Sequence, residues 1–475
     1  MKVLIGVHHF PPAFTGGAEW RALRTAQALT KRGHEVRVVA VESITGEQTG
    51  GMSSDQAGPV TWRDETFSGV AVRRLSFDLA RAPDRVRWEY DNPWTGDHIR
   101  SLLADWRPSI FHLISGYLLT GRVLLEAAAA HVPSVVTLTD FWFLCQRVQM
   151  VRTNGQLSTF PIYAETCARC VAEESRRFRW PRRVLPAMMD WYWKHERPRT
   201  AAIRSRMDFL GKALESATRI ISPSEFLRQS FIAAGVSPSR IVFSRQGRDF
   251  PGLTQADLKK TASTRVRLAY IGQLVDVKGT HLALEAMRML ADAPLELHII
   301  GDAAHFPDYA ARLHTLAAGD ARIHFDGVKT PAEISALYRS IDALIVPSTW
   351  YENSPNTILE AFAHHTPVIA SRLGGMAELV QHDVSGLTFQ TGDAADLARQ
   401  LQRLIDDPGL LNRLSQGIGP VKSSAEEMDE LEALYREATA AVHTGHDGCD
   451  QRDDQRDGQR DGQRDPDSAS QLGQR

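Results

Sequence analysis

The fold and a candidate active site both follow from residues 343–361, which read ALIVPSTWYENSPNTILEA. The run 343–346 is wholly apolar, as expected of a parallel strand buried on both faces, and it ends at Pro347. Apolar residues then recur at helical spacing over 356–364, and Pro355 suits the first turn of such a helix. The stretch therefore predicts a strand, a loop and a helix in succession.

Two carboxylates flank the start of this predicted helix. Glu352 stands in the loop before it, and Glu360 lies on its second turn. The free backbone N–H groups of the helix start face the same crevice and make a ready site for an anion. A ligand with both a phosphate and hydroxyl-rich sugars would suit this arrangement.

The spacing of the two glutamates resembles the Glu-x7-Glu signature of the family 4 retaining glycosyltransferases. Further motifs follow in the order that this family shows: Val346-Pro347-Ser348, Glu360-Ala361, Pro367-Val368-Ile369-Ala370, Gly374-Gly375, Glu378 and Gly386. Chance explains each motif singly, but not their order. The resemblance covers about residues 2–440 and is strongest over 266–390. It implies the GT-B architecture, in which two doubly wound Rossmann-like α/β domains face each other across a cleft.

The composition bounds the class of protein. A length of 475 residues suggests two domains, and 55 Lys and Arg against 57 Asp and Glu argue against a dedicated nucleic-acid binder. We see no apolar run of the roughly 20 residues that a membrane span needs, and no signal-peptide core at the N-terminus. Four cysteines in so long a chain form no disulfide framework, so we expect a reducing, cytoplasmic location.

Strand-like and helix-like segments alternate along the chain, which favours two α/β domains. Strands are predicted at 3–7, 34–41, 70–75, 110–114, 135–138 and 217–224, and then at 267–274, 295–301, 323–327, 343–346 and 368–370. We assign an N-terminal domain to 1–249, a linker to 250–264 and a C-terminal domain to 265–424. The resemblance implies that a helix over 425–443 crosses back onto the first domain. The Gln-Arg-Asp repeats of 444–475 lack apolar residues and predict a disordered tail.

Two loops of the N-terminal half are candidates for ligand contact. Gly16 and Gly17 stand at a strand-to-helix turn, where backbone N–H groups can approach a ligand, although a plain turn would look the same. In the resembled family this loop faces the donor phosphate and the acceptor. Asp140 could hold an acceptor or sugar hydroxyl, or it could cap a strand end. A histidine often precedes this aspartate in a subset of the family, but Thr139 stands there.

In the C-terminal half, Lys278 lies at a predicted helix start, where its charge could neutralise a diphosphate. The resembled family usually has an arginine near the start of this loop, but Gln273 stands there, and Arg245 or Arg248 could substitute across the cleft.

The resemblance implies transfer of a sugar from a UDP-, GDP- or ADP-sugar to an acceptor hydroxyl, with retention of configuration. It gives Glu352 the hydroxyls of the donor sugar, Glu360 those of the ribose, and Lys278 the growing charge of the leaving diphosphate. The predicted catalytic residues are Glu352, Lys278 and Asp140, and the predicted donor-binding residues are Gly16, Gly17, Gln273, Lys278, Ser354, Pro355, Asn356, Thr357, Glu360, Arg245 and Gly301. Thr139 and Gln273 motivate one alternative, a non-catalytic nucleotide-sugar-binding scaffold. Another is a different GT-B enzyme such as a sugar-nucleotide epimerase.

Three cysteines raise the question of a metal. Cys145 and the pair Cys167-x-x-Cys170 could bind a structural zinc ion if a fourth ligand such as His195 joined them. Free or buried thiols are the alternative. The resembled enzymes need no metal or other cofactor for catalysis.

Residues 176–206 carry the strongest local charge imbalance, with ten Lys and Arg against two acids and with Trp, Tyr, Phe and Met interleaved. Such a segment could rest on anionic lipid or grip a phosphate-bearing acceptor. A solvated basic helix that packs its tryptophans against the domain is the alternative. No nucleic-acid module accompanies it, so we expect no nucleic-acid partner. We favour a membrane-surface protein on the inner face of the membrane. Its acceptor would be a glycan or lipid-linked glycan, as in envelope polysaccharide or glycolipid assembly.

Overall fold

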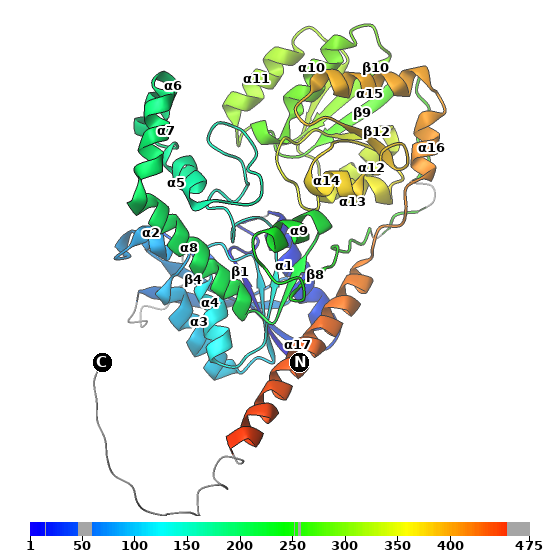
Figure 1. Ribbon diagram of the computed structural model, residues 1–475. Helices are drawn as coiled ribbons and strands as arrows, with labels where there is room; N and C mark the ends of the chain where they lie inside the picture. The colour runs from blue at the N-terminus through cyan, green and yellow to red at the C-terminus, as the bar shows by residue number, and fades with distance from the viewer. Residues whose placement is uncertain (15, 46–58, 251, 255–257, 454–475) are drawn as a thin grey trace, which may run out of the picture.

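The computed structural model describes residues 1–14, 16–45, 59–250, 252–254 and 258–453. Each half of the chain forms a sheet with helices on both faces, and the long helix α17 (Ser424–Asp453) runs from the second half back along the first (Figure 1). Both α/β domains expected from the alternation of segments are therefore present.

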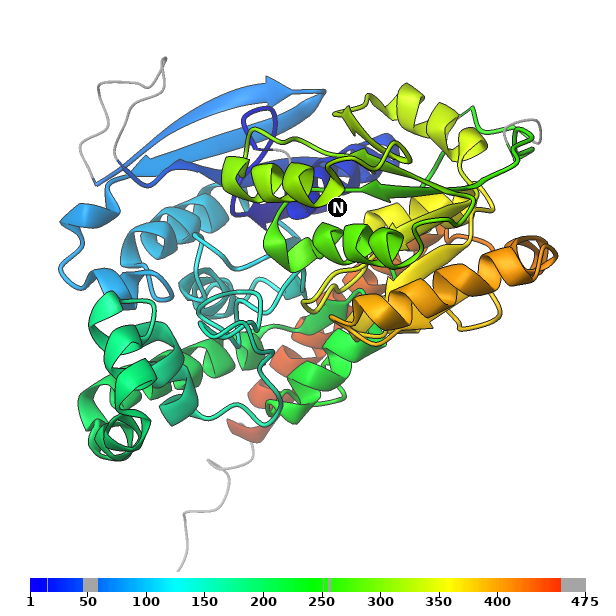
Figure 2. The same cartoon turned by 90° about the horizontal axis from the view of Figure 1, so that it is seen from above.

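The N-terminal sheet has the strand order β3-β4-β2-β1-β5-β6-β7-β8. Its strands are β1 (Lys2–Val7), β2 (Glu35–Ser43), β3 (Val60–Phe67), β4 (Val70–Phe77), β5 (Ile110–Ile114), β6 (Ser134–Thr137), β7 (Arg219–Ser222) and β8 (Ile241–Phe243). All neighbours pair in parallel except β3, which pairs with β4 in an antiparallel hairpin at the sheet edge (Figure 2). β3 was not predicted because this edge strand is only half-buried and four of its residues in a row, 63–66, are polar, so it shows no apolar run.

Helices cover both faces of this sheet. They are α1 (Gly17–Lys31), α2 (Arg85–Trp88), α3 (Pro93–Trp106), α4 (Arg122–Ala129), α5 (Ala164–Ala172), α6 (Arg176–Val184), α7 (Pro186–His195), α8 (Arg197–Ser216) and α9 (Glu225–Ala233), with a 3₁₀ turn η1 at Leu79–Arg81. The Ser224 hydroxyl accepts a hydrogen bond from the backbone N–H of Leu227 at 3.2 Å and so caps the start of α9.

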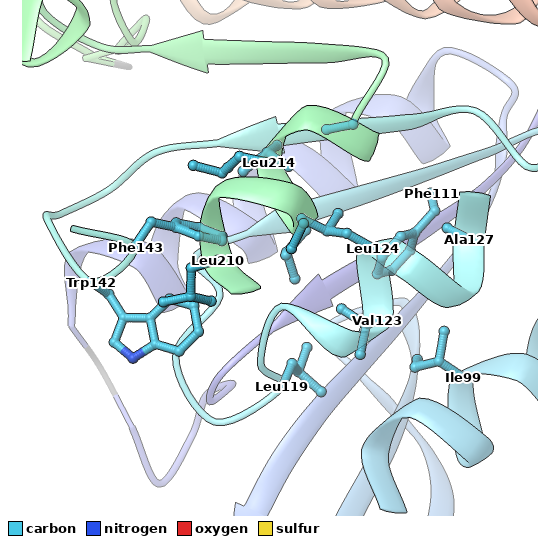
Figure 3. Close-up of a cluster of buried hydrophobic side chains, with 14 of the residues drawn as sticks. Ile99, Phe111, Leu119, Val123, Leu124, Ala127, Trp142, Phe143, Leu210 and Leu214 are labelled. Atoms are coloured by element: carbon cyan, nitrogen blue, oxygen red, sulfur yellow. The ribbon is translucent and has the colours of Figure 1, made fainter. Parts of the chain in front are cut away.

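One face of the N-terminal sheet is covered by α3, α4 and α8, which share a dry core (Figure 3). Leu210 and Leu214 of α8 pack with Val123 and Leu124 of α4, and all four side chains are buried. Burying an aliphatic side chain of this size contributes about 1.5–3 kcal/mol. This core therefore holds the helices that follow β5 and β6 firmly on the sheet.

The C-terminal sheet is parallel throughout, with the order β11-β10-β9-β12-β13-β14. Its elements are β9 (Val266–Ile271), η2 (Asp276–Lys278), α10 (Thr280–Met289), β10 (Leu295–Ile300), α11 (Pro307–Ala317), β11 (Ile323–Gly327), α12 (Pro331–Ser340), β12 (Ala343–Val346), α13 (Asn356–Ala363), β13 (Val368–Ser371), α14 (Gly374–Leu379), β14 (Gly386–Phe389), α15 (Ala394–Asp406) and α16 (Leu410–Gln416). The strand order reverses between β9 and β12, and in the first sheet between β1 and β5. Sheets of this kind bind ligands beyond the strand ends at such points.

Helix α17 ties the two halves together. Its Tyr435 is buried against the N-terminal sheet, where the hydroxyl lies 2.6 Å from Nδ1 of His112. Arg21 of α1 pairs with Glu427 at 2.8 Å. The helix continues to Asp453, so the expectation of a disordered tail is wrong for residues 444–453, because extending an established helix is far easier than starting one. Residues 454–475, the rest of that expected tail, lie outside the described residues. Over the described ranges, no helix is long and apolar enough to cross a membrane.

Candidate active site

A cavity of about 620 Å³ is lined by residues of both halves of the chain. Ten of the predicted site residues line it: Gly16, Gly17, Asp140, Gln273, Lys278, Glu352, Ser354, Pro355, Asn356 and Thr357. Glu360, Arg245 and Gly301 do not line it. The structure thus brings most of the predicted residues together, although the strands and loops that carry them lie far apart in the sequence.

Two helix starts open on this cavity. Helix α13 begins at Asn356, with Pro355 as its N-cap residue and no side-chain cap, so Pro355 precedes the first turn instead of forming it. Helix α1 begins at Gly17, also without a side-chain cap. The first N–H groups of a helix lack partners within the helix and carry partial positive charge. The cavity therefore offers backbone donors to an anion from both halves.

Glu352 and Lys278 form the central ion pair of the cavity. The Glu352 Oε1 atom accepts hydrogen bonds from Lys278 Nζ at 2.5 Å, Trp350 Nε1 at 2.8 Å and Ser348 Oγ at 3.0 Å. Lys278 ends the turn η2, and Gly279 follows with φ of 71°. A Cβ atom on Gly279 would stand 2.0 Å from the backbone oxygen of Pro347, so only glycine allows this approach.

Glu360 lies on α13 as predicted, but its carboxylate pairs with Arg248 at 2.5 Å. Burial raises the pKa of Glu360, and the charges of Arg248 and Arg24 oppose that shift. Arg245 pairs with Glu378 at 2.6 Å. Both arginines that could have replaced the family arginine at the cavity are thus held by carboxylates outside its lining.

Gly301 has a packing role behind the cavity wall. A Cβ atom there would stand 2.2 Å from the backbone oxygen of Gly272, a residue that does line the cavity. Gly301 therefore lets the ends of β10 and β9 come close together. Because it does not line this cavity, its predicted contact with the donor stays a prediction.

Asp140 contributes from the N-terminal half. Its Oδ1 accepts from the backbone N–H of Trp142 at 2.8 Å, and its Oδ2 accepts from the Thr139 hydroxyl at 3.0 Å. Burial raises the pKa of Asp140, and these hydrogen bonds oppose the shift. Asp140 therefore both caps the end of its strand and presents a carboxyl group to the cavity.

His8 and Glu19 also line the cavity, and the sequence analysis missed both. His8 follows β1 and Glu19 lies on the first turn of α1, with His8 Nε2 3.2 Å from Glu19 Oε1. Burial acts to raise the pKa of Glu19, but the hydrogen bond and the charge of His8 outweigh it, so the pKa of Glu19 is lowered. The signal that could have found them is the acid two residues after Gly17 and the histidine directly after β1. His8 also supplies this cavity with an imidazole, the group that Thr139 replaces in the neighbouring loop.

The three cysteines do not form the predicted zinc site. They line one small cavity and are free thiols. Over the described parts of the chain, no three His, Cys, Asp or Glu side chains are grouped so that they could hold a metal ion. Burial raises the pKa of Cys145, and that of Cys167 to about 11. His195 Nδ1 lies 2.8 Å from the Trp191 backbone oxygen instead.

The basic segment 176–206 forms α6, α7 and the first part of α8. It divides its aromatic residues between two environments. Trp180 and Trp191 are 62% and 63% exposed, whereas Trp193 is 6% exposed and packs with Met189. Both interpretations of the segment thus find partial support, since some of its tryptophans pack on the protein and others face solvent.

Comparison with known proteins agrees with this geometry. Residues 16–245 match the family model of the glycosyl transferase 4-like domain, and residues 265–407 match that of the glycosyl transferases group 1. A D-inositol 3-phosphate glycosyltransferase of Geodermatophilus obscurus is 30% identical over 254 residues, which cover 50% of this chain and 56% of that relative. The amylovoran biosynthesis glycosyltransferase AmsK of Erwinia amylovora is 29% identical over 248 residues, 48% of this chain and 57% of the relative. The chain thus matches little more than half the length of these two proteins.

Among solved structures, HepE of Anabaena in complex with UDP superimposes with a TM-score of 0.60 at 16% identity, over 91% of this chain and 99% of that chain. At this identity the likeness concerns the fold alone, and it confirms the expected GT-B architecture. The two family models match the two halves that enclose the cavity, and the chain therefore belongs to the family 4 glycosyltransferases of the GT-B fold.

Proposed function

We propose that this protein is a retaining glycosyltransferase that moves a sugar from a nucleotide-sugar donor to an acceptor hydroxyl. The observation that carries the proposal is the Lys278–Glu352 pair beside the uncapped start of α13, in a cavity lined by both halves. A cation and free N–H groups suit a diphosphate, and a carboxylate suits sugar hydroxyls. The UDP in the HepE structure of the same fold supports a nucleoside diphosphate as the leaving group.

In the reaction, the bond between the anomeric carbon and the diphosphate oxygen breaks, and a bond to the acceptor oxygen forms. Negative charge grows on the diphosphate, where Lys278 and the N–H groups of α13 stabilise it without having to reorganise. Retention follows if the acceptor attacks the face that the diphosphate leaves. The acceptor proton then passes to the departing diphosphate, so this step needs no nucleophile from the protein.

The two glutamates divide the donor between them. Glu352 is fixed by three donors on Oε1 and contacts the hydroxyls of the transferred sugar. Glu360 accepts a hydrogen bond from Arg248 on Oε1, and its second carboxylate oxygen binds the ribose beyond the lining of the cavity. Asp140 and the His8–Glu19 pair face the acceptor from the N-terminal half.

The acceptor in this proposal is a glycan or lipid-linked glycan at the inner face of a membrane. The name of AmsK, an amylovoran biosynthesis glycosyltransferase, supports a role in polysaccharide assembly. The exposed Trp180 and Trp191, together with Met188 and Leu185, stand among arginines, a mixture that suits an anionic lipid surface.

A donor screen tests the proposal. Purified protein is incubated with UDP-, GDP- and ADP-sugars and candidate glycan acceptors, and both released nucleotide and glycosylated product are measured. Glu352→Ala is expected to abolish transfer in a folded protein, whereas Glu296→Ala, on β10 outside the cavity lining, serves as the matched control. Saturable nucleotide binding without turnover would establish the scaffold instead. Conversion of the nucleotide-sugar to an epimer would establish the epimerase.

A further inference from the structure

A second cavity, of about 470 Å³, lies in the helical segment that follows β6. It shares no lining residue with the candidate active site. Its wall is formed by the loop 152–156, by α5 and α7, and by Arg182 of α6. Figure 1 shows these helices standing at one side of the N-terminal half, away from α17.

The wall of this cavity carries more positively than negatively charged side chains. The three carboxylates are all in ion pairs: Glu165 with Arg204 at 2.9 Å, Glu173 with Arg169 at 2.9 Å and Arg182 at 2.8 Å, and Asp190 with Arg169 at 2.7 Å. Two further wall residues, Arg152 and Lys194, have no carboxylate partner in the part of the chain that the structure describes. The wall can therefore accept negative charge from a ligand without losing an existing ion pair.

Trp193 adds a buried donor that has no acceptor. The residue lines this cavity, is 6% exposed, and its Nε1 atom has no hydrogen-bond partner. Its ring is fixed against Phe178 and Tyr192, with centroid distances of 5.6 and 5.1 Å. The Nε atom of Arg152 is likewise buried without a partner. Unpaired buried donors are rare because each one costs desolvation, and each of these two lacks an acceptor from the protein.

The remaining wall residues suit hydroxyl groups. Thr153, Asn154, Gln156 and Thr166 are neutral polar side chains that can donate and accept. We infer that this cavity binds a sugar that carries an oxyanion, either a carboxylate or a phosphate, as a second binding site for the acceptor glycan.

The position of the loop supports an acceptor as the ligand, and this part of the inference rests on the proposed function. The loop after β6 serves both cavities, because Val148 lines the active site and residues 152–156 line the second cavity. The Tyr351 hydroxyl, beside Glu352, donates to the Ser158 backbone oxygen at 3.2 Å. A glycan longer than one sugar can thus contact one continuous segment at both places.

Binding of small sugars to the full chain tests this inference without any donor present. Glucuronate, glucose 6-phosphate, glucose and inorganic phosphate are each titrated by calorimetry. One or both of the charged sugars should bind saturably and more tightly than glucose or inorganic phosphate. Whichever charged sugar binds more tightly identifies the source of the oxyanion.

Two variants on one helix localise the site. Trp193→Phe keeps an aromatic but smaller ring and removes the N–H donor, so it should weaken binding of the charged sugar about tenfold, the effect of one hydrogen bond to a charged group. The smaller ring leaves a void that should lower the melting temperature modestly, so binding is compared at a temperature where both variants are folded. Trp191→Phe, two residues away and 63% exposed, is the matched control and should bind as the wild type does.

Equal binding by the two variants would overturn the inference, as would inorganic phosphate binding as tightly as either sugar, or no saturable binding of any charged sugar. These outcomes are separate from the donor screen. Release of nucleotide by a protein that binds no charged sugar removes this inference only. Binding of a charged sugar by a protein without transfer removes the proposed function and the acceptor assignment, and leaves the charged-sugar site.

Discussion

Replacing Lys278 with methionine removes the ammonium group and keeps a side chain of similar length. The Glu352 carboxylate then loses one of its three hydrogen-bond donors and its only ion-pair partner within the described residues. Breaking a buried ion pair costs about 3–5 kcal/mol, and the partial exposure of Lys278 reduces this to about 2 kcal/mol of unfolding free energy. The diphosphate also loses its cation, so transfer should fall about 100- to 1,000-fold.

The double variant Lys278→Met/Glu352→Gln separates the two effects. It removes both charges, so no uncompensated carboxylate remains and much of the lost stability should return. Transfer should stay low, because the cation is still absent and the catalytic carboxylate is replaced as well. Denaturant unfolding measures the first quantity, and nucleotide release with the best donor of the screen measures the second. Transfer within a few-fold of wild type in the single variant, or its recovery in the double variant, would refute the role given to Lys278.

Three further predictions follow from other parts of the structure. Gly279→Ala should lower both stability and transfer, because alanine is strained at a positive φ and its Cβ atom would collide with a backbone oxygen. The control Gly392→Ala, at φ of 78° with open space around it, should lower the free energy of unfolding by only about 1 kcal/mol and keep its activity. Burial lowers the pKa of His112 to about 3, so between pH 6.5 and pH 3 the unfolded chain binds a proton at this residue and the folded chain does not. The free energy of unfolding should therefore fall as the pH drops through this range. His112→Gln should unfold more easily at pH 7 in chemical denaturation, yet its stability should depend less on pH. The double variant Trp180→Ser/Trp191→Ser should co-sediment with anionic vesicles several-fold less than wild type does, and unchanged sedimentation would contradict the proposed membrane surface.

The sequence by itself determined the central strands and the βα unit that carries Glu352. The predicted strands 110–114, 323–327 and 343–346 match β5, β11 and β12 residue for residue. β11 is an edge strand of sequence IHFDG and is only partly buried, whereas β5 and β12 are buried along their whole length and are nearly continuous apolar runs. Local pattern is sufficient there, because the same burial applies along the whole strand.

Only the tertiary structure decided which charged groups meet. Lys278 and Glu352 are 74 residues apart in sequence, and Arg248 and Glu360 are 112 apart. No periodicity links such pairs, since their contact depends on how loops from different strands and from both halves pack around one cavity. The sequence therefore indicated Glu360 and Arg248 as separate candidates for the ligand, and the fold joined them to each other.

The same reason explains the residues that sequence reasoning missed or misjudged. His8 became a site residue because β1 lies beside the strand order reversal of its sheet, which no local pattern reveals. The cysteines have a spacing that zinc ligands share, but within the described residues the fold brings no third and fourth ligand into a group that could hold a metal ion. Local sequence fixes which elements form, because backbone geometry and burial act on near neighbours. Long-range packing fixes what each side chain faces, because charge, desolvation and hydrogen bonding depend on neighbours in space.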